Sequence, residues 1–221
     1  MFDIDWVPGR DAFLNILREF QLLQQRPKPR HTTNSNHRYH KYKNLIKGFI
    51  PTGPNQLWVS DITYIDLVGG CCYLHLVTDA YSRKIIGWCI SNTLEAVYTL
   101  DALKMAISTA SADELCNLIH HSDRGVQYCS KAYTDELKKY NISISMTEDY
   151  KPTDNAIAER VNGILKTEVI YRERRFKDID EGRNRISSFI KFYNEKRPHS
   201  SIGYKVPNQA HSETGLQKQC W

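Results

Sequence analysis

The clearest pattern in the chain is a series of apolar, β-branched segments that begins at Leu57. Residues 57–67 (LWVSDITYIDL) alternate with an apolar bias, which predicts a β-strand. Gly69 and Gly70 predict a hairpin turn, and residues 72–82 and 84–91 predict two more strands that turn near Ser82 and Arg83. This part of the chain therefore predicts three antiparallel strands in series.

Helical and short apolar segments alternate after this meander. Thr93 is the predicted N-cap of the first helix, and Thr153 or Asp154 that of the helix that carries Glu159. The predicted order βββαβαβα indicates an α/β fold with a mixed five-stranded sheet flanked by helices. Its later elements are a helix over about 94–110, a strand over 117–123, a helix over 131–140, a strand over 142–146, a helix from about 155 to Arg172 and a helix over about 178–194.

The two flanks of this core differ from it in character. Residues 10–25 have the apolar spacing of a short amphipathic helix, and residues 26–50 are rich in Arg, Lys, His, Asn and Tyr without regular periodicity. We interpret residues 1–50 as an N-terminal helix and basic arm, 51–172 as the core, and 173–221 as a C-terminal helix and basic extension.

Charge follows the same division. Residues 1–56 hold nine Lys and Arg against four Asp and Glu, residues 57–150 hold seven against twelve, and residues 151–221 hold fourteen against nine. An acidic middle between two basic flanks suits a protein whose ends hold a polyanion while its centre concentrates carboxylates. Ordinary surface charge is the simpler alternative, and the charge pattern alone does not exclude it.

Composition excludes several other classes of protein. No apolar run approaches the roughly 20 residues of a membrane helix, and the N-terminus has no signal pattern, so we expect a cytoplasmic protein. The six cysteines form no CxxC pair and fit small buried hydrophobic groups in a reducing compartment. A zinc site at His31, His37 and His40 is a weaker alternative to a solvated basic segment.

Three acidic residues occupy positions where carboxylates are informative. Asp61 lies in the middle of the first strand, Asp123 directly follows the fourth, and Glu159 lies early in a helix, with thirty-five residues between the last two. A carboxylate in a buried strand is costly unless something pairs with it. Converging carboxylates need a cation, and hard oxygen ligands select Mg²⁺ or Mn²⁺. From the residues alone, Asp79, at the end of the second strand, stays a serious rival to Asp61.

Four motifs in order resemble the integrase core of bacterial insertion-sequence transposases, in particular the second-reading-frame product of elements that make their transposase by frameshifting. They are QLWVSDITYI, HSDRGVQY, DNAIAERVNGILKTE and YNEKRPHSSIGYKVP, and the resemblance covers roughly residues 10–210. It implies a ribonuclease H-like fold, shared with retroviral integrases. It also implies a catalytic and metal-binding triad of Asp61, Asp123 and Glu159, in preference to Asp79.

The resemblance further implies the reaction and its partners. Two Mg²⁺ ions, with Mn²⁺ as a substitute, would support donor-strand cleavage and strand transfer. The expected partners are double-stranded DNA (transposon ends and target), a first-reading-frame product and further copies of the chain on DNA, near the bacterial nucleoid.

Several basic residues are candidate DNA contacts. Lys166 lies seven residues after Glu159, on the same helical face, and matches a basic residue of the family's catalytic helix. For Arg197 and His199, a DNA contact and a structural role in the turn around Tyr193 and Pro198 are equally favoured. The predicted DNA-contacting residues are Lys166, Arg172, Arg174, Arg175, Arg197 and His199.

Two features depart from the family pattern and keep alternatives open. Arg160-Val161-Asn162 stands where the family commonly has Ser-Phe-Phe, and the N-terminal helix matches only the tail of the family's helix-turn-helix region. We therefore expect an N-terminal helix-turn-helix remnant. The alternatives to an active transposase are a nuclease on the same fold, which cuts without joining, and a non-enzymatic DNA-binding remnant of a transposon.

Overall fold

The structure is a computed structural model that describes residues 9–22, 37–148, 155–170 and 175–217. Its contacts divide the chain into two units, residues 1–31 and 32–221. The described part of the first unit contains helix α1 (Arg10–Glu19), which confirms the predicted amphipathic helix. No residue of α1 is buried.

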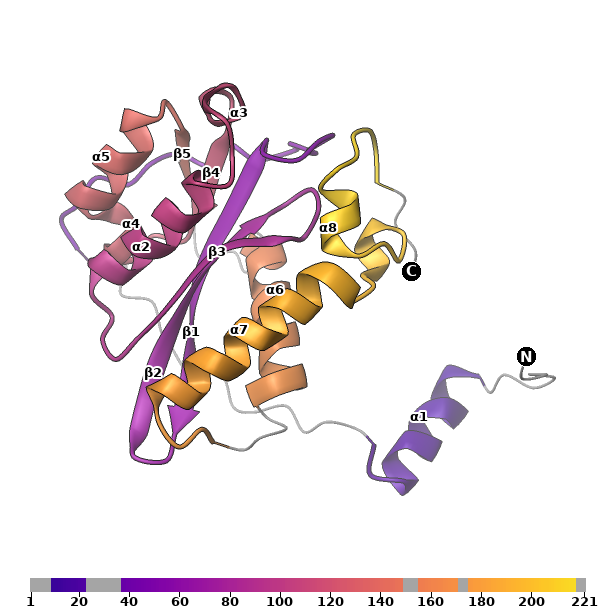
Figure 1. The fold of residues 1–221 in the computed structure, drawn as a ribbon. Helices are drawn as coiled ribbons and strands as arrows, with labels where there is room; N and C mark the ends of the chain where they lie inside the picture. The colour runs from indigo at the N-terminus through magenta and orange to yellow at the C-terminus, as the bar shows by residue number, and fades with distance from the viewer. Residues whose placement is uncertain (1–8, 23–36, 149–154, 171–174, 218–221) are drawn as a thin grey trace. The chain divides into compact units, whose positions relative to one another are not determined.

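The second unit is built on a five-stranded sheet. Strands β1 (Leu57–Leu67), β2 (Gly70–Asp79) and β3 (Ile85–Ser91) form an antiparallel meander, as predicted. Strands β4 (Ile119–Ser122) and β5 (Ser143–Met146) extend the sheet in parallel on the other side of β1. The order β3-β2-β1-β4-β5 places β1 at the centre of a mixed sheet, which confirms the predicted class (Figure 1).

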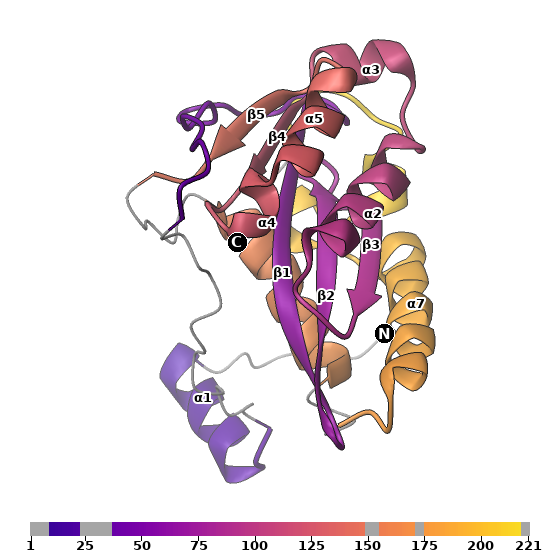
Figure 2. The ribbon, with the colours of Figure 1, turned by 90° about the vertical axis from the view of Figure 1, so that its left-hand side faces the viewer.

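Helices cover both faces of this sheet. The described helices of the unit are α2 (Ala96–Ile107), α3 (Ala112–Cys116), α4 (Val126–Cys129), α5 (Lys131–Lys139), α6 (Ala156–Leu165), the π-helix η2 (Lys166–Ile170), α7 (Ile179–Lys196), the 3-10 helix η3 (Ser200–Ile202) and α8 (Pro207–Ala210). Apolar side chains of the strands point alternately to α2 and α5 on one face and to α6 and α7 on the other. Figures 1 and 2 show the resulting three layers, with the sheet between two sets of helices.

The contact between α2 and β3 depends on one glycine. A Cβ atom built on Gly87 would lie 2.1 Å from the carbonyl oxygen of Ala102 and 2.9 Å from the backbone nitrogen of Ala106. No side chain fits at that distance, so Gly87 lets the helix backbone lie directly on the strand. This close approach sets how α2 packs on the sheet.

The basic segment before the sheet lies against the core. Residues 37–50 contain no helix or strand, as predicted for a linker. They nevertheless bond to the β5 region: Leu45 N–H donates to the Ser145 hydroxyl at 2.9 Å, and Asn44 N–H donates to Glu148 at 3.1 Å. The segment is therefore part of the folded unit and not a free arm.

One local prediction was wrong. Helix α2 is capped at Glu95, two residues after Thr93, whose carbonyl oxygen instead accepts a bond from the Ser91 hydroxyl. The predicted caps of the helix that carries Glu159, Thr153 and Asp154, lie outside the described residues, and α6 has its N-cap at Asn155. The predicted long helix is described as far as Ile170, and its hydrogen bonding changes at Lys166 from that of an α-helix to that of the π-helix η2.

Candidate active site

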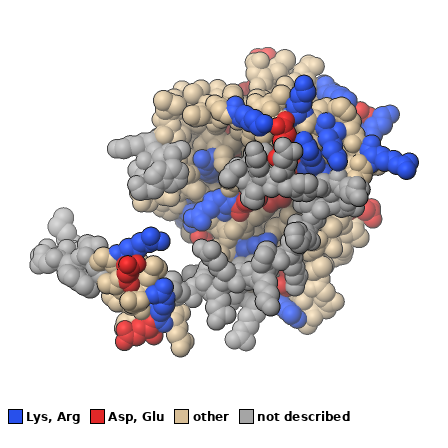
Figure 3. Space-filling view, turned by 180° about the vertical axis from the view of Figure 1, so that it is seen from behind, with Lys and Arg blue, Asp and Glu red and all other residues tan. Residues whose placement is uncertain are grey.

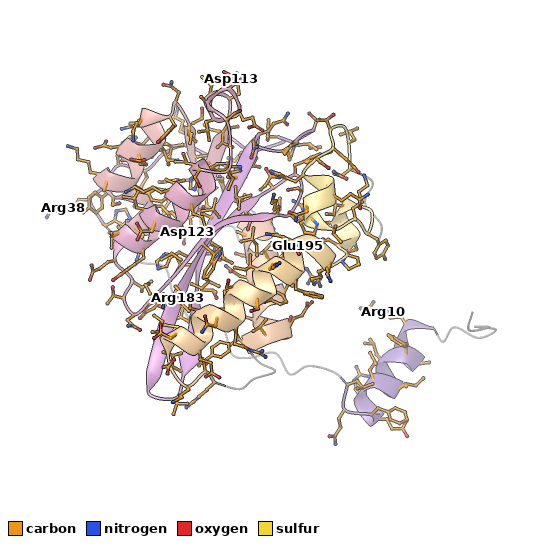
Figure 4. The ribbon with its side chains drawn as sticks, viewed as in Figure 1. Arg10, Arg38, Asp113, Asp123, Arg183 and Glu195 are labelled. Carbon is orange, nitrogen blue, oxygen red and sulfur yellow. The ribbon has the colours of Figure 1, made fainter. Side chains whose placement is uncertain are left out.

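The pairing of β1 with β4 brings two of the predicted acids together. The last pair of this parallel ladder is Val59 with His121, and Asp61 and Asp123 each lie two residues further along their strands. Neighbouring strands lie about 4.8 Å apart. The strand β4 ends at Ser122, and Asp123, labelled in Figure 4, follows at its carboxyl end. Two carboxylates from distant parts of the sequence thus lie side by side at the centre of the sheet.

Asp61 is a carboxylate with few hydrogen-bond donors. One oxygen accepts from the backbone N–H of Ile62 at 2.9 Å, and the other accepts from the side-chain amide of Asn162 at 2.7 Å. Burial, and then the negative charge of Asp123, raise the pKa of Asp61 to about 7, with Glu159 adding to the rise. The two donors oppose this rise and do not cancel it.

Asp123 is held by the loop that follows it. The N–H of Gly125 donates to Asp123 Oδ1 at 2.9 Å. A Cβ atom on Gly125 would lie 2.9 Å from that same oxygen, closer than such contacts allow. A side chain at this position would displace the Asp123 carboxylate from its present place, so the glycine leaves room for Asp123 at the cleft.

Glu159 reaches this region on α6, which is tied to β1 at two points. Asn155, at the helix N-cap, donates its side-chain amide to the backbone oxygen of Ser60 at 3.0 Å. Asn162 donates to Asp61, as described above. Residues 155, 159 and 162 share one helical face, so the two bonds bracket Glu159 on the side facing β1. Glu159 is exposed, and partial burial raises its pKa.

A cleft opens where these elements meet. Both aspartates line it, whereas Glu159 does not, and no group of three acidic, His or Cys side chains among the described residues is close enough to hold a metal ion. The structure thus brings Asp61 and Asp123 together and leaves Glu159 adjacent. The lining residues are Asp61, Ile62, Tyr64, Leu94, Asp123, Gly125, Gln127 and Tyr128.

The rival carboxylate Asp79 has different surroundings. It is fully buried at the end of β2, where it accepts bonds from the backbone N–H of Asn55 and from both the N–H and the hydroxyl of Ser82, all at 2.7–2.8 Å. The turn it closes includes Arg83 at a φ of +65°. Asp79 is therefore bonded into the β2–β3 turn and does not line the acidic cleft.

Two residues near the acids were missed by the sequence analysis. Asn162 was noted only as a departure from the family pattern, although its buried amide contacts Asp61. Asn155 lies four residues before Glu159, a spacing that places a polar side chain on the same helical face and could have indicated a contact.

The predicted DNA contacts lie in different environments. Lys166 begins η2 and is half-buried, and Arg175 is exposed. Arg172 and Arg174 lie outside the described residues. Arg197 contacts both oxygens of Glu168, at 2.6–3.0 Å, and His199 is buried, with its ring nitrogen Nδ1 at 3.0 Å from the Ser201 hydroxyl. Burial, followed by the charge of Arg83, lowers the pKa of His199 to about 4.

Basic side chains gather elsewhere on the second unit. Figure 3 shows Lys and Arg concentrated along one edge of the face opposite to the view of Figure 1. The segment 37–50 contributes Lys47, which pairs with Glu148, and Lys138 of α5 lies over the ring of Tyr42 at 5.9 Å. This edge adds a positively charged surface to the unit that carries the acidic cleft.

Other predictions from composition concern metals, thiols and membranes. His37 contacts the backbone oxygen of Arg124 at 2.9 Å, and the described residues contain no zinc-like cluster; His31 lies outside them. The described cysteines, Cys71, Cys72, Cys89, Cys116 and Cys129, are free thiols. Within the described ranges, no helix has the length and apolar character needed to cross a bilayer.

Comparison with protein families matches the core region. Two models described as integrase core domain match residues 51–152 and 140–207. A putative transposase of insertion sequence IS986/IS6110 from Mycobacterium tuberculosis is 33% identical over 198 residues, covering 88% of this chain and 71% of the relative. Transposase InsF of IS3A from Escherichia coli is 39% identical over 166 residues, which cover 75% of this chain and 57% of that relative. A 31 kDa protein of insertion element IS600 from Shigella sonnei is 36% identical, covering 91% and 74%.

Solved structures with a similar fold are retroviral integrases. The simian T-cell lymphotropic virus intasome, in complex with the PP2A regulatory subunit B56 gamma, aligns with a TM-score of 0.61 at 21% identity, covering 87% of this chain and 63% of that one. The HTLV-2 integrase catalytic core domain, in complex with magnesium, aligns with a TM-score of 0.56 at 20% identity, covering 73% and 99%. These similarities confirm the ribonuclease H-like fold. The chain therefore belongs to the bacterial insertion-sequence transposases with an integrase core domain, a family of polynucleotidyl transferases that act in DNA transposition.

Proposed function

We propose that this chain catalyses metal-dependent DNA cleavage and strand transfer, with Asp61, Asp123 and Glu159 as its catalytic and metal-binding residues. The observation that carries the proposal is that Asp61 and Asp123, each two residues beyond the pairing of Val59 with His121, line one cleft. Such a pair of carboxylates is unfavourable by itself, because each charge opposes ionisation of the other. A bound cation removes that penalty.

The donor set fits Mg²⁺, with Mn²⁺ as a substitute. Both cleft acids offer oxygen ligands, which these ions prefer. The raised pKa of Asp61 is what a metal-binding carboxylate would show without its cation. Asp61 and Asp123 would hold the first ion, and Glu159 would complete the site for a second. When bound, the ions supply charge neutralisation at the reacting phosphate and activation of the attacking hydroxyl.

Other residues of the chain position the three proposed acids. Asn155 and Asn162 hold α6 against β1, so Glu159 needs only a local movement of side chain or helix to join the aspartates. Gly125 keeps Asp123 turned into the cleft. Above a pH of about 7 Asp61 is ionised without a metal, and cation binding extends that ionised state to lower pH.

For DNA contacts, we propose two groups of residues with different roles. Lys166 and Arg175, with Arg172 and Arg174, would bind phosphates near the transposon end. The ion pair of Arg197 with Glu168 and the burial of His199 favour the structural role for the latter two. Because Glu168 belongs to η2, which begins with Lys166, Arg197 would fix the segment that presents this lysine.

Double-stranded DNA is the proposed substrate, as transposon ends and target. The similarity to an integrase from an intasome supports action on DNA by several copies of the chain together. A first-reading-frame product is a further proposed partner, which would contribute to recognition of the ends.

The test is a strand-transfer assay with transposon-end DNA, a target plasmid and Mg²⁺. We expect joined product from the wild-type chain, and a loss of roughly a thousandfold or more for Asp61→Asn, Asp123→Asn or Glu159→Gln. Asp101→Asn, an exposed acid on α2, is the matched control and should retain activity. Circular dichroism checks that each variant folds.

The same assay separates the alternatives. Hydrolysis of the ends without joined product would identify a nuclease on the same fold. Full activity in any one of the three acid variants would refute the triad, and DNA binding without any reaction would identify a non-enzymatic transposon remnant.

A further inference from the structure

One buried hydroxyl next to the acidic cleft has no partner. Tyr128 of α4 lies five residues after Asp123 and is 2% exposed, and its phenolic oxygen has no hydrogen-bond partner among the described residues. Leaving a buried hydroxyl unpaired costs stability, so such groups are rare and need an explanation.

Tyr128 lies beside the acidic residues of the cleft. Tyr128 lines the same cleft as Asp61 and Asp123. Burial, and then the charges of these two aspartates, raise the pKa of Tyr128 well above its ordinary value. The phenol therefore keeps its proton at every working pH and can act only as a neutral hydroxyl.

A neighbouring tyrosine differs from Tyr128 in the partner of its hydroxyl. The rings of Tyr128 and Tyr133 contact each other edge to face, with centroids 5.5 Å apart, and both are buried. The hydroxyl of Tyr133 is bonded to the ring nitrogen Nε2 of His120 at 2.9 Å, deep in the core. The two tyrosines thus share one apolar cluster, but only Tyr128 lines the acidic cleft, and its hydroxyl has no partner among the described residues.

We propose that the hydroxyl of Tyr128 donates a hydrogen bond to an oxygen of the reacting DNA phosphate, which makes Tyr128 a further catalytic residue. This inference rests on the proposed function. The carboxylates of the cleft accept hydrogen bonds and cannot donate one to a phosphate, so a neutral donor beside them adds an interaction that neither the carboxylates nor a bound cation supplies. The side-chain amide of Gln127, another lining residue, already donates to the backbone oxygen of Leu94 at 2.9 Å. Tyr128 supplies a neutral donor that does not compete with a cation for the aspartates.

The experiment compares Tyr128→Phe with Tyr133→Phe. For Tyr128→Phe we expect an unchanged or raised Tm, because an unpaired buried hydroxyl is removed. Donor-strand cleavage and strand transfer should each fall roughly tenfold to a hundredfold in kcat, with the Kd for end DNA measured in EDTA unchanged. Tyr133→Phe should show the reverse, with a lower Tm because its bond to His120 is lost, and with normal kcat below that Tm.

The two reactions locate the contact, because a reacting phosphate occupies the same place in both. The nucleophile differs: it is water in donor-strand cleavage and the transposon 3′-hydroxyl in strand transfer. A loss confined to one reaction, or wild-type kcat for Tyr128→Phe, would overturn the inference while leaving the proposed function in place. The inference would also be overturned if Tyr128→Phe lowered the Tm together with kcat, and if Tyr133→Phe lowered kcat equally. That result would indicate that both tyrosines act through packing. Absence of any product with the wild-type chain would reject the proposed function, and this inference with it.

Discussion

Asp61 and Asp79 lie on neighbouring strands of one hairpin, and their surroundings differ in the donors they offer. Asp79 accepts three hydrogen bonds from Asn55 and Ser82 and closes a turn. Asp61 accepts one bond from its own neighbour and one from Asn162, and it faces a second carboxylate. Hydrogen bonds satisfy the charge of Asp79, whereas Asp61 has fewer donors and a neighbouring carboxylate, which fits its proposed role as a metal ligand.

The largest expected effect on stability comes from the replacement of Asp79. In Asp79→Asn one side-chain oxygen is replaced by an NH₂ group, which faces N–H donors that need an acceptor. We expect a loss of about 3 kcal/mol in the free energy of unfolding, measured in urea. Strand transfer by the folded variant at low temperature should stay close to wild type. Loss of transfer with unchanged stability would reverse the roles assigned to Asp79 and Asp61.

A second prediction concerns Asp61, whose replacement should stabilise the fold, whereas that of Asp79 destabilises it. Because its folded pKa is raised from 3.8 to about 7, the metal-free native state is progressively penalised as the pH rises between these values. Asp61→Asn should therefore match wild type in stability near pH 4 and exceed it above pH 7, by about 2 kcal/mol after allowance for partial exposure. Unfolding in EDTA across this range gives the measurement. A variant less stable than wild type at pH 8 would show that Asp61 is satisfied without a cation.

The smallest expected effect is a shift in the pKa of Asp61 when one of its hydrogen-bond donors is removed. Asn162→Ala removes a donor that favours the ionised form, so the pKa of Asp61 should rise further, by about one pH unit. Carbon NMR of the labelled carboxyl group follows the titration. Asn155→Ala is the control, because Asn155 bonds to the backbone of Ser60 and not to the carboxylate. Equal shifts in both variants would mean that the position of α6, and not the hydrogen bond, controls the pKa.

The alternation of apolar residues was sufficient to predict the sheet and its neighbouring helices. The period of residues 57–67 and the glycines that follow specify a hairpin through local chemistry. The helix boundary at Thr93 was wrong, because a capping residue competes with other local bonds, such as the one between the Ser91 hydroxyl and the Thr93 carbonyl. The π-helix after Leu165 has no sequence signature of this kind.

The site was predictable in part, for a related reason. A carboxylate inside a buried strand and one at a strand end indicated Asp61 and Asp123, but they did not exclude Asp79, because the sequence does not show which donors reach a carboxylate. The contacts of Asn162 and the unpaired hydroxyl of Tyr128 arise between elements distant in the chain. Only the packed structure brings such groups together, so no periodicity could reveal them.

The parallel pairing of β1 with β4 has a consequence for synthesis of the chain. The antiparallel meander can form from residues that leave the ribosome consecutively, whereas β4 must cross over α2 and α3 before it can join β1. Contacts of such sequence separation form late in folding. A growing or broken chain that lacks β4 and the residues after it can thus contain a folded hairpin with Asp61 and still lack Asp123 beside it. Under the proposed site assignment, the topology delays assembly of the acidic pair until nearly the whole core is present.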